Sequence, residues 1–169
     1  MKSLLMKITF FILFLLPFQF FSQFTTSSNL IWLKDSSRIE REYLQTDQRR
    51  YFVPCPYCKH KQVLTWKNLK WTDYDPNTAA YECENCHKLI QEHHKSYMLT
   101  NGLWMSTVES NTKAIGFHIN SLYSPLGWKS WKDIVEEFLR VKNDAPSLKT
   151  WVNTILGETF EEDYANKIG

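Results

Sequence analysis

Four cysteines in two closely spaced pairs are the residues of this sequence best suited to chemistry. The pairs are Cys55-Pro56-Tyr57-Cys58 and Cys83-Glu84-Asn85-Cys86, and 24 residues separate them. Two thiolates three positions apart can bind the same metal ion, and two such pairs supply the four sulfur ligands of a tetrahedral Zn²⁺ site. The sequence therefore predicts a structural zinc site formed by Cys55, Cys58, Cys83 and Cys86, with no open position for catalysis.

The same thiols are compatible with other chemistries. Cys-Pro-Tyr-Cys also matches redox motifs in which the first cysteine begins a helix, but the residues after Cys58 favour a turn and a strand. The thiols could form two disulfides in an oxidising compartment, or they could bind iron. Because four cysteines complete a zinc site, we assign no metal-binding or catalytic role to the nearby histidines, which are His60, His87, His93 and His94.

Short strands are predicted on both sides of each cysteine pair. Their residue types and alternation indicate strands at 51–54, 63–66, 80–82 and 88–90. A polar loop at residues 73–78, with Pro76 as a breaker, separates the two halves. These elements predict a small antiparallel sheet of the zinc-ribbon type over residues 51–92.

A short helix is predicted before this sheet and a strand after it. Ser37 and Glu40 have the spacing of a capping box, which predicts a helix that ends near Asp47. Residues 114–120 favour a strand, and a turn follows at residues 124–127.

Two amphipathic helices are predicted near the end of the chain. Ser130 is expected to cap a helix that runs to about Lys142, and a second helix begins after Pro146 and ends at Gly157. Each helix carries one apolar stripe, so the two should pack antiparallel or cover a sheet. The predicted fold class is therefore α+β, with a small antiparallel zinc-ribbon-like sheet followed by a strand and two amphipathic helices.

The first 36 residues differ sharply in composition from the rest. They hold seven of the eleven phenylalanines, and Lys2 and Lys7 are the only charged residues before Lys34. Lysines followed by the apolar run 8–16 are typical of a secretory signal. That run is short for a membrane span, and export would favour oxidation of the cysteines over zinc binding.

Charge is distributed unevenly along the remainder. Between Arg38 and Lys70 there are eight basic and three acidic residues, whereas between Asp133 and Asp163 there are eight acidic and three basic ones. The basic half could lie along a phosphate backbone or could simply face solvent. From Lys34 onward there are 18 basic and 18 acidic residues, and this balance excludes a strongly basic nucleic-acid-binding domain.

Five stretches carry a resemblance to a known family. They are residues 37–41, 46–58, 81–86, 116–125 and 153–162. In order and spacing they resemble, from about residue 37 onward, the large subunit of lambda-like (GpA-type) tailed-phage terminases, in which a packaging ATPase is joined to a nuclease. The resemblance implies that residues 37–50 are the helical end of the ATPase-side region and 51–92 a ribbon insert. Residues 93–169 would lead toward the nuclease domain, and residues 1–36 do not resemble the family.

The catalytic motifs of that family are not found in this sequence. None of the five glycines begins the phosphate-binding pattern G-x-x-x-x-G-K-[ST]. No apolar strand ends in an Asp-Glu pair that could hold Mg²⁺, and few residues follow Glu162 to build a two-metal nuclease site. We therefore expect no catalytic or cofactor-binding residue, no ATP or Mg²⁺ site, and no activity of the chain alone.

The resulting hypothesis is a truncated remnant of a prophage-encoded terminase large subunit in the cytoplasm of a bacterial host. The resemblance implies DNA and the terminase small subunit or portal as partners, no small-molecule substrate, and a membrane only if the leader acts as a signal. One alternative is a stand-alone zinc-ribbon module that binds nucleic acid or protein through exposed aromatic residues and through Arg38, Arg41, Arg49 and Arg50. Another is a secreted disulfide-bonded protein.

Overall fold

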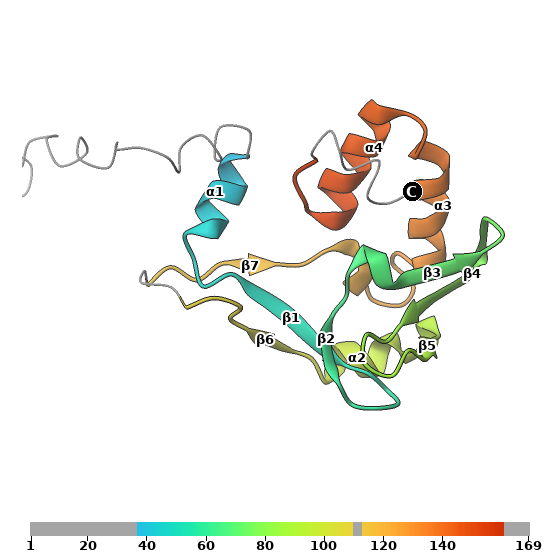
Figure 1. Cartoon of the computed structure of the whole chain (residues 1–169), viewed down its shortest axis with the longest axis horizontal. Helices are drawn as coiled ribbons and strands as arrows, with labels where there is room; N and C mark the ends of the chain where they lie inside the picture. The colour runs from blue at the N-terminus through green and yellow to red at the C-terminus, as the bar shows by residue number, and fades with distance from the viewer. Residues whose placement is uncertain (1–36, 110–112, 161–169) are drawn as a thin grey trace, which may run out of the picture. The chain divides into compact units, whose positions relative to one another are not determined.

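The computed structural model describes residues 37–109 and 113–160 (Figure 1). The predicted leader, residues 1–36, lies outside the described residues. The described helices and strands, in chain order, are α1 (Arg38–Leu44), β1 (Arg49–Pro54), β2 (Lys61–Val63), η2 (Trp66–Asn68), β3 (Leu69–Thr72), β4 (Asp75–Glu82), β5 (Leu89–Ile90), η3 (Glu92–His94), α2 (Lys95–Thr100), β6 (Leu103–Met105), β7 (Phe117–His118), η4 (Ser121–Tyr123), α3 (Trp131–Val141), α4 (Ala145–Trp151) and the π-helical turn η5 (Val152–Leu156). No helix in this part of the chain is long and apolar enough to cross a membrane.

The strands form two small sheets. In the first sheet, β1 pairs antiparallel with β2 and β6 and parallel with β7. In the second, β4 lies between β3 and β5, and both pairings are antiparallel. The α+β class with small antiparallel sheets followed by helices is confirmed, but the ribbon strands are divided between two sheets instead of forming one.

The division occurs where the predicted strand 63–66 is wrong. β2 ends at Val63, because the next two backbone N–H groups donate to tyrosine hydroxyls and not to a neighbouring strand. Leu64 N donates to the Tyr123 hydroxyl at 2.7 Å, and Thr65 N donates to the Tyr81 hydroxyl at 3.1 Å. The chain then enters the 3-10 helix η2 and begins the second sheet.

The predicted loop 73–78 is also shorter than expected. Only Asp73 and Tyr74 form the turn, with φ angles of 50° and 58°, the pattern of a two-residue hairpin turn that matches the twist of the strands. β4 therefore starts at Asp75 and contains Pro76. Proline is tolerated there because only residues 81 and 82 of β4 pair with β5, which leaves the opposite edge at Pro76 without a described strand partner.

The predicted strand 114–120 is reduced to the two residues of β7. Its N-terminal side is fastened by other bonds: Gly116 N donates to Asp47 Oδ1 at 3.2 Å, and Arg49 N donates to the Gly116 carbonyl at 2.8 Å. A Cβ at Gly116 would lie 2.1 Å from Thr46 Oγ1. The close approach of these two segments therefore requires glycine.

The helices begin and end close to where the sequence predicts. Ser130 and Asp133 form a complete capping box for α3, and Gly157 ends η5 with φ 64°. In α1, Ser37 Oγ accepts from Glu40 N at 3.1 Å, which forms the serine half of the predicted box. The Glu40 carboxylate instead accepts a hydrogen bond from Thr159.

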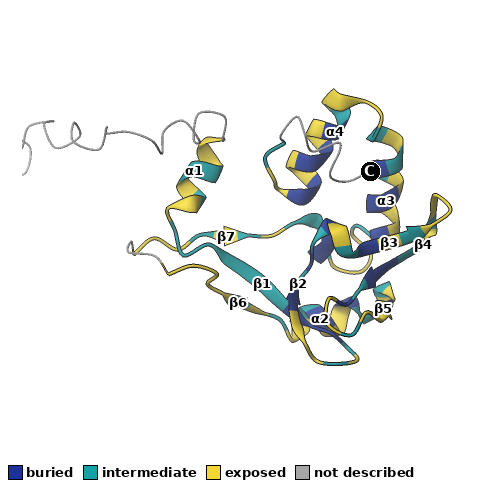
Figure 2. Ribbon diagram, in the orientation of Figure 1, coloured by how far each residue is buried: buried dark blue, intermediate teal, exposed yellow. Residues whose placement is uncertain are grey.

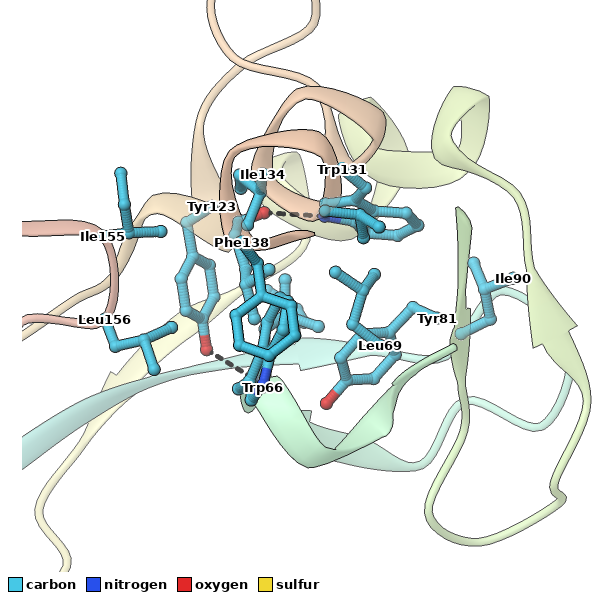
Figure 3. Close-up of a cluster of buried hydrophobic side chains, with 14 of the residues drawn as sticks. Trp66, Leu69, Tyr81, Ile90, Tyr123, Trp131, Ile134, Phe138, Ile155 and Leu156 are labelled. Atoms are coloured by element: carbon cyan, nitrogen blue, oxygen red, sulfur yellow. Dashed lines mark hydrogen bonds between the residues drawn. The ribbon is translucent and has the colours of Figure 1, made fainter. Parts of the chain in front are cut away.

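One hydrophobic core joins the second sheet to the two later helices (Figures 2 and 3). The ring of Trp66 lies 4.9 Å from that of Phe138 on α3 and 4.7 Å from that of Trp151 on α4, measured between centroids. Trp131 Nε1 donates to the Leu122 carbonyl at 3.0 Å. The predicted apolar stripes of both helices are therefore core-forming, and α3 packs on β4.

A buried ion pair fixes the start of α3 to the segment after β5. The side chain of Lys95 is fully buried, and its Nζ lies 2.5 Å from Glu92 Oε1. The same carboxylate oxygen accepts from Trp131 N at 3.0 Å, and the Lys95 amine lies 5.0 Å from the centroid of the Trp131 ring. Burial lowers the pKa of Lys95, and the Glu92 carboxylate opposes that shift.

We expect Glu92→Gln to lower the free energy of unfolding by about 3–5 kcal/mol, because it leaves a buried ammonium group without its anion. Urea unfolding measures the change. The control is Lys129→Met, which removes the partly exposed pair of Lys129 with Glu137 (2.8 Å) and should cost less than about 1 kcal/mol. Equal losses in the two variants would contradict a special role for the buried pair.

Candidate metal centre

The four cysteines predicted as metal ligands meet at one point. Their sulfur atoms all lie within 4.8 Å of one another. The Sγ atoms of Cys55 and Cys86 are 3.8 Å apart, and those of Cys58 and Cys83 are 3.7 Å apart. These distances exceed the roughly 2.05 Å of a disulfide bond, and all four cysteines are free.

The two pairs are positioned by backbone loops of the same construction. After β1, Cys55 N donates to the His60 carbonyl at 2.8 Å and Lys59 N donates to the Cys55 carbonyl at 3.0 Å. After β4, Cys83 N donates to the Lys88 carbonyl at 3.1 Å and His87 N donates to the Cys83 carbonyl at 2.9 Å. Each loop thus turns back tightly enough to aim two sulfurs at one centre.

The turn requires a left-handed residue after the second cysteine of each pair. Lys59 has φ 65° and His87 has φ 55°, a conformation that is uncommon for residues other than glycine. The chain after Cys58 continues through this turn into β2 and not into a helix, so the first pair lacks the helix N-terminus on which redox Cys-x-x-Cys motifs depend.

Polar contacts hold the two loops against each other. Gln62 is buried, and its Oε1 accepts a hydrogen bond from Glu84 N at 3.0 Å. On the exposed side, His60 Nε2 lies 3.0 Å from Glu84 Oε1, and Asn85 Nδ2 lies 3.7 Å from Cys58 Sγ. Gln62 carried no signal in the sequence that marked it as a contact between the two pairs, because glutamine is usually exposed.

The surroundings of the sulfurs affect their protonation in different ways. Cys55 and Cys83 are buried, and burial raises the pKa of both thiols, to about 12 for Cys83. A backbone hydrogen bond from His60 is the largest of the causes that lower the pKa of Cys58 to about 6. Two buried sulfurs therefore become thiolates only when a cation compensates for the missing water.

The donor set fits a tetrahedral metal ion. With metal–sulfur bonds of about 2.3 Å, the edges of an S₄ tetrahedron measure about 3.8 Å, which is the separation of the two closest sulfur pairs. A site with four protein ligands has no position for water or substrate. The arrangement can hold a metal and stabilise the loops, but it offers no reaction centre.

The nearby histidines do not join the sulfurs. Among the described residues, the only group able to hold a metal consists of the four cysteines. His60 and His87 are exposed and lie near Glu84 and Glu82, respectively, while His94 Nε2 lies 3.3 Å from the Tyr57 hydroxyl.

Two of the four arginines suggested for nucleic-acid binding are engaged within the fold. Arg49 Nε lies 2.7 Å from Asp47 Oδ2, and Arg50 Nη1 lies 2.7 Å from His118 Nδ1. The side chain of Arg49 also lies over the Phe117 ring at 5.9 Å. Arg49 and Arg50 therefore hold the start of β1 against Asp47 and His118, and two of the four suggested arginines make contacts within the fold.

Comparisons with known proteins identify both parts of the chain. The family model described as "Phage terminase large subunit gpA, ATPase domain" matches residues 22–104, and "Terminase large subunit gpA, endonuclease domain" matches residues 114–168. The first match begins at residue 22, inside the leader that the sequence separates from the family at residue 36. No solved structure matches the chain.

Two relatives support the same assignment. The chain is 31% identical over 164 residues to the terminase large subunit of Enterobacteria phage P21, which covers 80% of the chain and 24% of the relative. It is 30% identical over 152 residues to the terminase large subunit of Escherichia phage lambda, covering 76% and 23%. The chain thus spans about a quarter of the length of these relatives. Because two family models of one subunit match in succession along it, the chain belongs to the family of GpA-type phage terminase large subunits.

Proposed function

We propose that this chain forms the zinc-stabilised segment that joins the ATPase side to the nuclease side of a GpA-type terminase large subunit. The observation that carries the proposal is the convergence of four sulfurs within 4.8 Å, in a unit that contains residues matched by each of the two family models. Cys55, Cys58, Cys83 and Cys86 would hold Zn²⁺ as thiolates. The metal would fasten the first sheet to the second, since each sheet contributes one cysteine pair.

The role of the segment is structural. ATP-driven DNA translocation and DNA cleavage are proposed for the whole large subunit, to which this chain corresponds over about a quarter of the relatives' length. The sequence holds neither the G-x-x-x-x-G-K-[ST] pattern nor an Asp-Glu pair after an apolar strand. DNA and the small subunit or portal would be partners of the assembled large subunit.

The metal is the first property to measure. We expect the purified protein to contain one zinc ion per chain by elemental analysis, because the four sulfurs form a single closed site. Cys83→Ser should lower the zinc content severalfold, since it removes one thiolate of the closed set. The control is His93→Ala, which changes an exposed histidine outside both cysteine loops and should keep the metal. Full zinc binding in Cys83→Ser, or loss of zinc in His93→Ala, would contradict the ligand assignment.

Removing the metal should also loosen the two later helices. Their core includes Trp66 and Tyr81, which lie between the cysteine pairs. Chelation should therefore diminish the near-UV circular dichroism of the tryptophan cluster as well as the far-UV strand signal, and added zinc should restore both. An unchanged tryptophan signal after complete removal of the metal would show that the helices fold without the ribbon.

A further inference from the structure

The segment that leads into the unit and the segment that leaves it lie against each other. We call residues 37–50, which contain α1 and the start of β1, the incoming segment, and residues 157–160 the outgoing segment. The incoming segment falls in the part matched by the ATPase-domain model, and the outgoing segment in the part matched by the endonuclease-domain model. Two separate sets of contacts join them.

The first set runs through His118. Arg50 Nη1 lies 2.7 Å from His118 Nδ1, and His118 Nε2 lies 3.0 Å from the Gly157 carbonyl oxygen. Arginine can only donate, so His118 Nδ1 accepts and the Nε2–H donates to Gly157. The neutral imidazole therefore bridges β1 to the residue that ends η5.

The position of Gly157 depends on its being glycine. Its φ of 64° lies in the left-handed region, and a Cβ would lie 3.4 Å from both His118 Nε2 and the Ile119 carbonyl oxygen. The left-handed turn redirects the chain out of η5 and presents the Gly157 carbonyl to the imidazole. The left-handed conformation of Gly157 is therefore needed for its hydrogen bond with His118.

The second set joins α1 directly to the outgoing segment. Thr159 Oγ1 donates to Glu40 Oε2 at 2.5 Å, across 119 positions of sequence. Glu40 lies in the first turn of α1, where its carboxylate is also favoured by the helix dipole. A hydrogen bond to an ionised acceptor is stronger than one between neutral groups, so this contact is suited to holding two chain segments together.

We propose that Glu40, Arg50, His118, Gly157 and Thr159 form a clasp that holds the incoming and outgoing segments side by side. Resting on the proposed function, the clasp would make the ATPase and nuclease portions of the large subunit attach to the ribbon unit at neighbouring points. The five members of the clasp are positioning residues. They would set the points at which the flanking portions attach. The ribbon and its helices lie between the incoming and outgoing segments in sequence, and the chain leaves this unit close to where it entered.

Hydrogen exchange on the full chain tests the clasp. Thr159→Val removes the bond to Glu40, and we expect the amides of α1 to exchange about fivefold faster, as loss of one net hydrogen bond implies. Thr154→Val is the matched control, because it also removes one threonine hydrogen bond, to the Thr150 carbonyl at 2.8 Å, and that bond lies between α4 and η5. It should leave the exchange of α1 unchanged.

A second variant addresses the other contact. His118→Ala should accelerate exchange of α1 and also of the Glu158 amide, which donates to the Val152 carbonyl at 3.5 Å. Exchange of α1 that is the same in Thr159→Val, His118→Ala and the unsubstituted protein would overturn the proposal. Zinc content reports separately on the metal site, so a failed clasp and a failed zinc assignment give different results.

The clasp should also weaken in acid. Burial is the first cause, and the Arg50 charge the second, that lower the pKa of His118 from its ordinary value of 6.5. The other groups facing it are Tyr43, whose ring centroid lies 6.0 Å away, and Glu158, whose charge favours protonation. Because His118 binds a proton more readily in the unfolded chain, the stability that its contacts contribute is fully present above about pH 6.5. This contribution declines as the pH falls below that value. Urea unfolding should show this decline, and His118→Gln should reduce it.

Discussion

The fold depends on bringing four thiol groups to one point and keeping two of them out of water. Cys55 and Cys83 are buried at the ends of β1 and β4, where burial opposes the thiolate form. A bound cation removes that penalty, because it compensates the sulfur charge directly. Neither sheet is large enough to be stable alone. The contact between the two cysteine loops therefore decides whether the two sheets are held together.

The second constraint is the aromatic core, which links the cysteine-bearing sheets to the two later helices. Trp66 follows the first cysteine pair in sequence, yet its ring packs against Phe138 and Trp151 on the two later helices. Tyr123 lies late in the sequence and contacts residues near the first cysteine pair. Its hydroxyl accepts from Leu64 N and donates to the Tyr51 carbonyl at 2.6 Å. Residues from both sides of the boundary between the two family models thus complete each other's hydrogen bonds and packing.

Local signals in the sequence were sufficient for features whose cause is local. The cysteine spacing indicated the cluster, Ser130 and Asp133 indicated the start of α3, and Gly157 indicated the end of the last helical turn. The errors at residues 63–66 and 114–120 have distant causes. The strand predicted at 63–66 ends early because tyrosines 59 and 16 positions away from Leu64 and Thr65 accept their N–H groups. The burial of Lys95 was not predicted either, because lysine is rarely buried, although its partner Glu92 lies only three positions earlier.

The arrangement of polar contacts explains why the boundary between the family models need not be a physical boundary between domains. β1 pairs with β6, of which Leu103 and Trp104 lie in the part matched by the ATPase model, and with β7, from the part matched by the nuclease model. A flexible linker would require few contacts across the junction. Here Asp47 binds Gly116, and Arg50 binds His118. The two parts matched by the family models are therefore joined within one unit by strand pairing, hydrogen bonds and packed side chains.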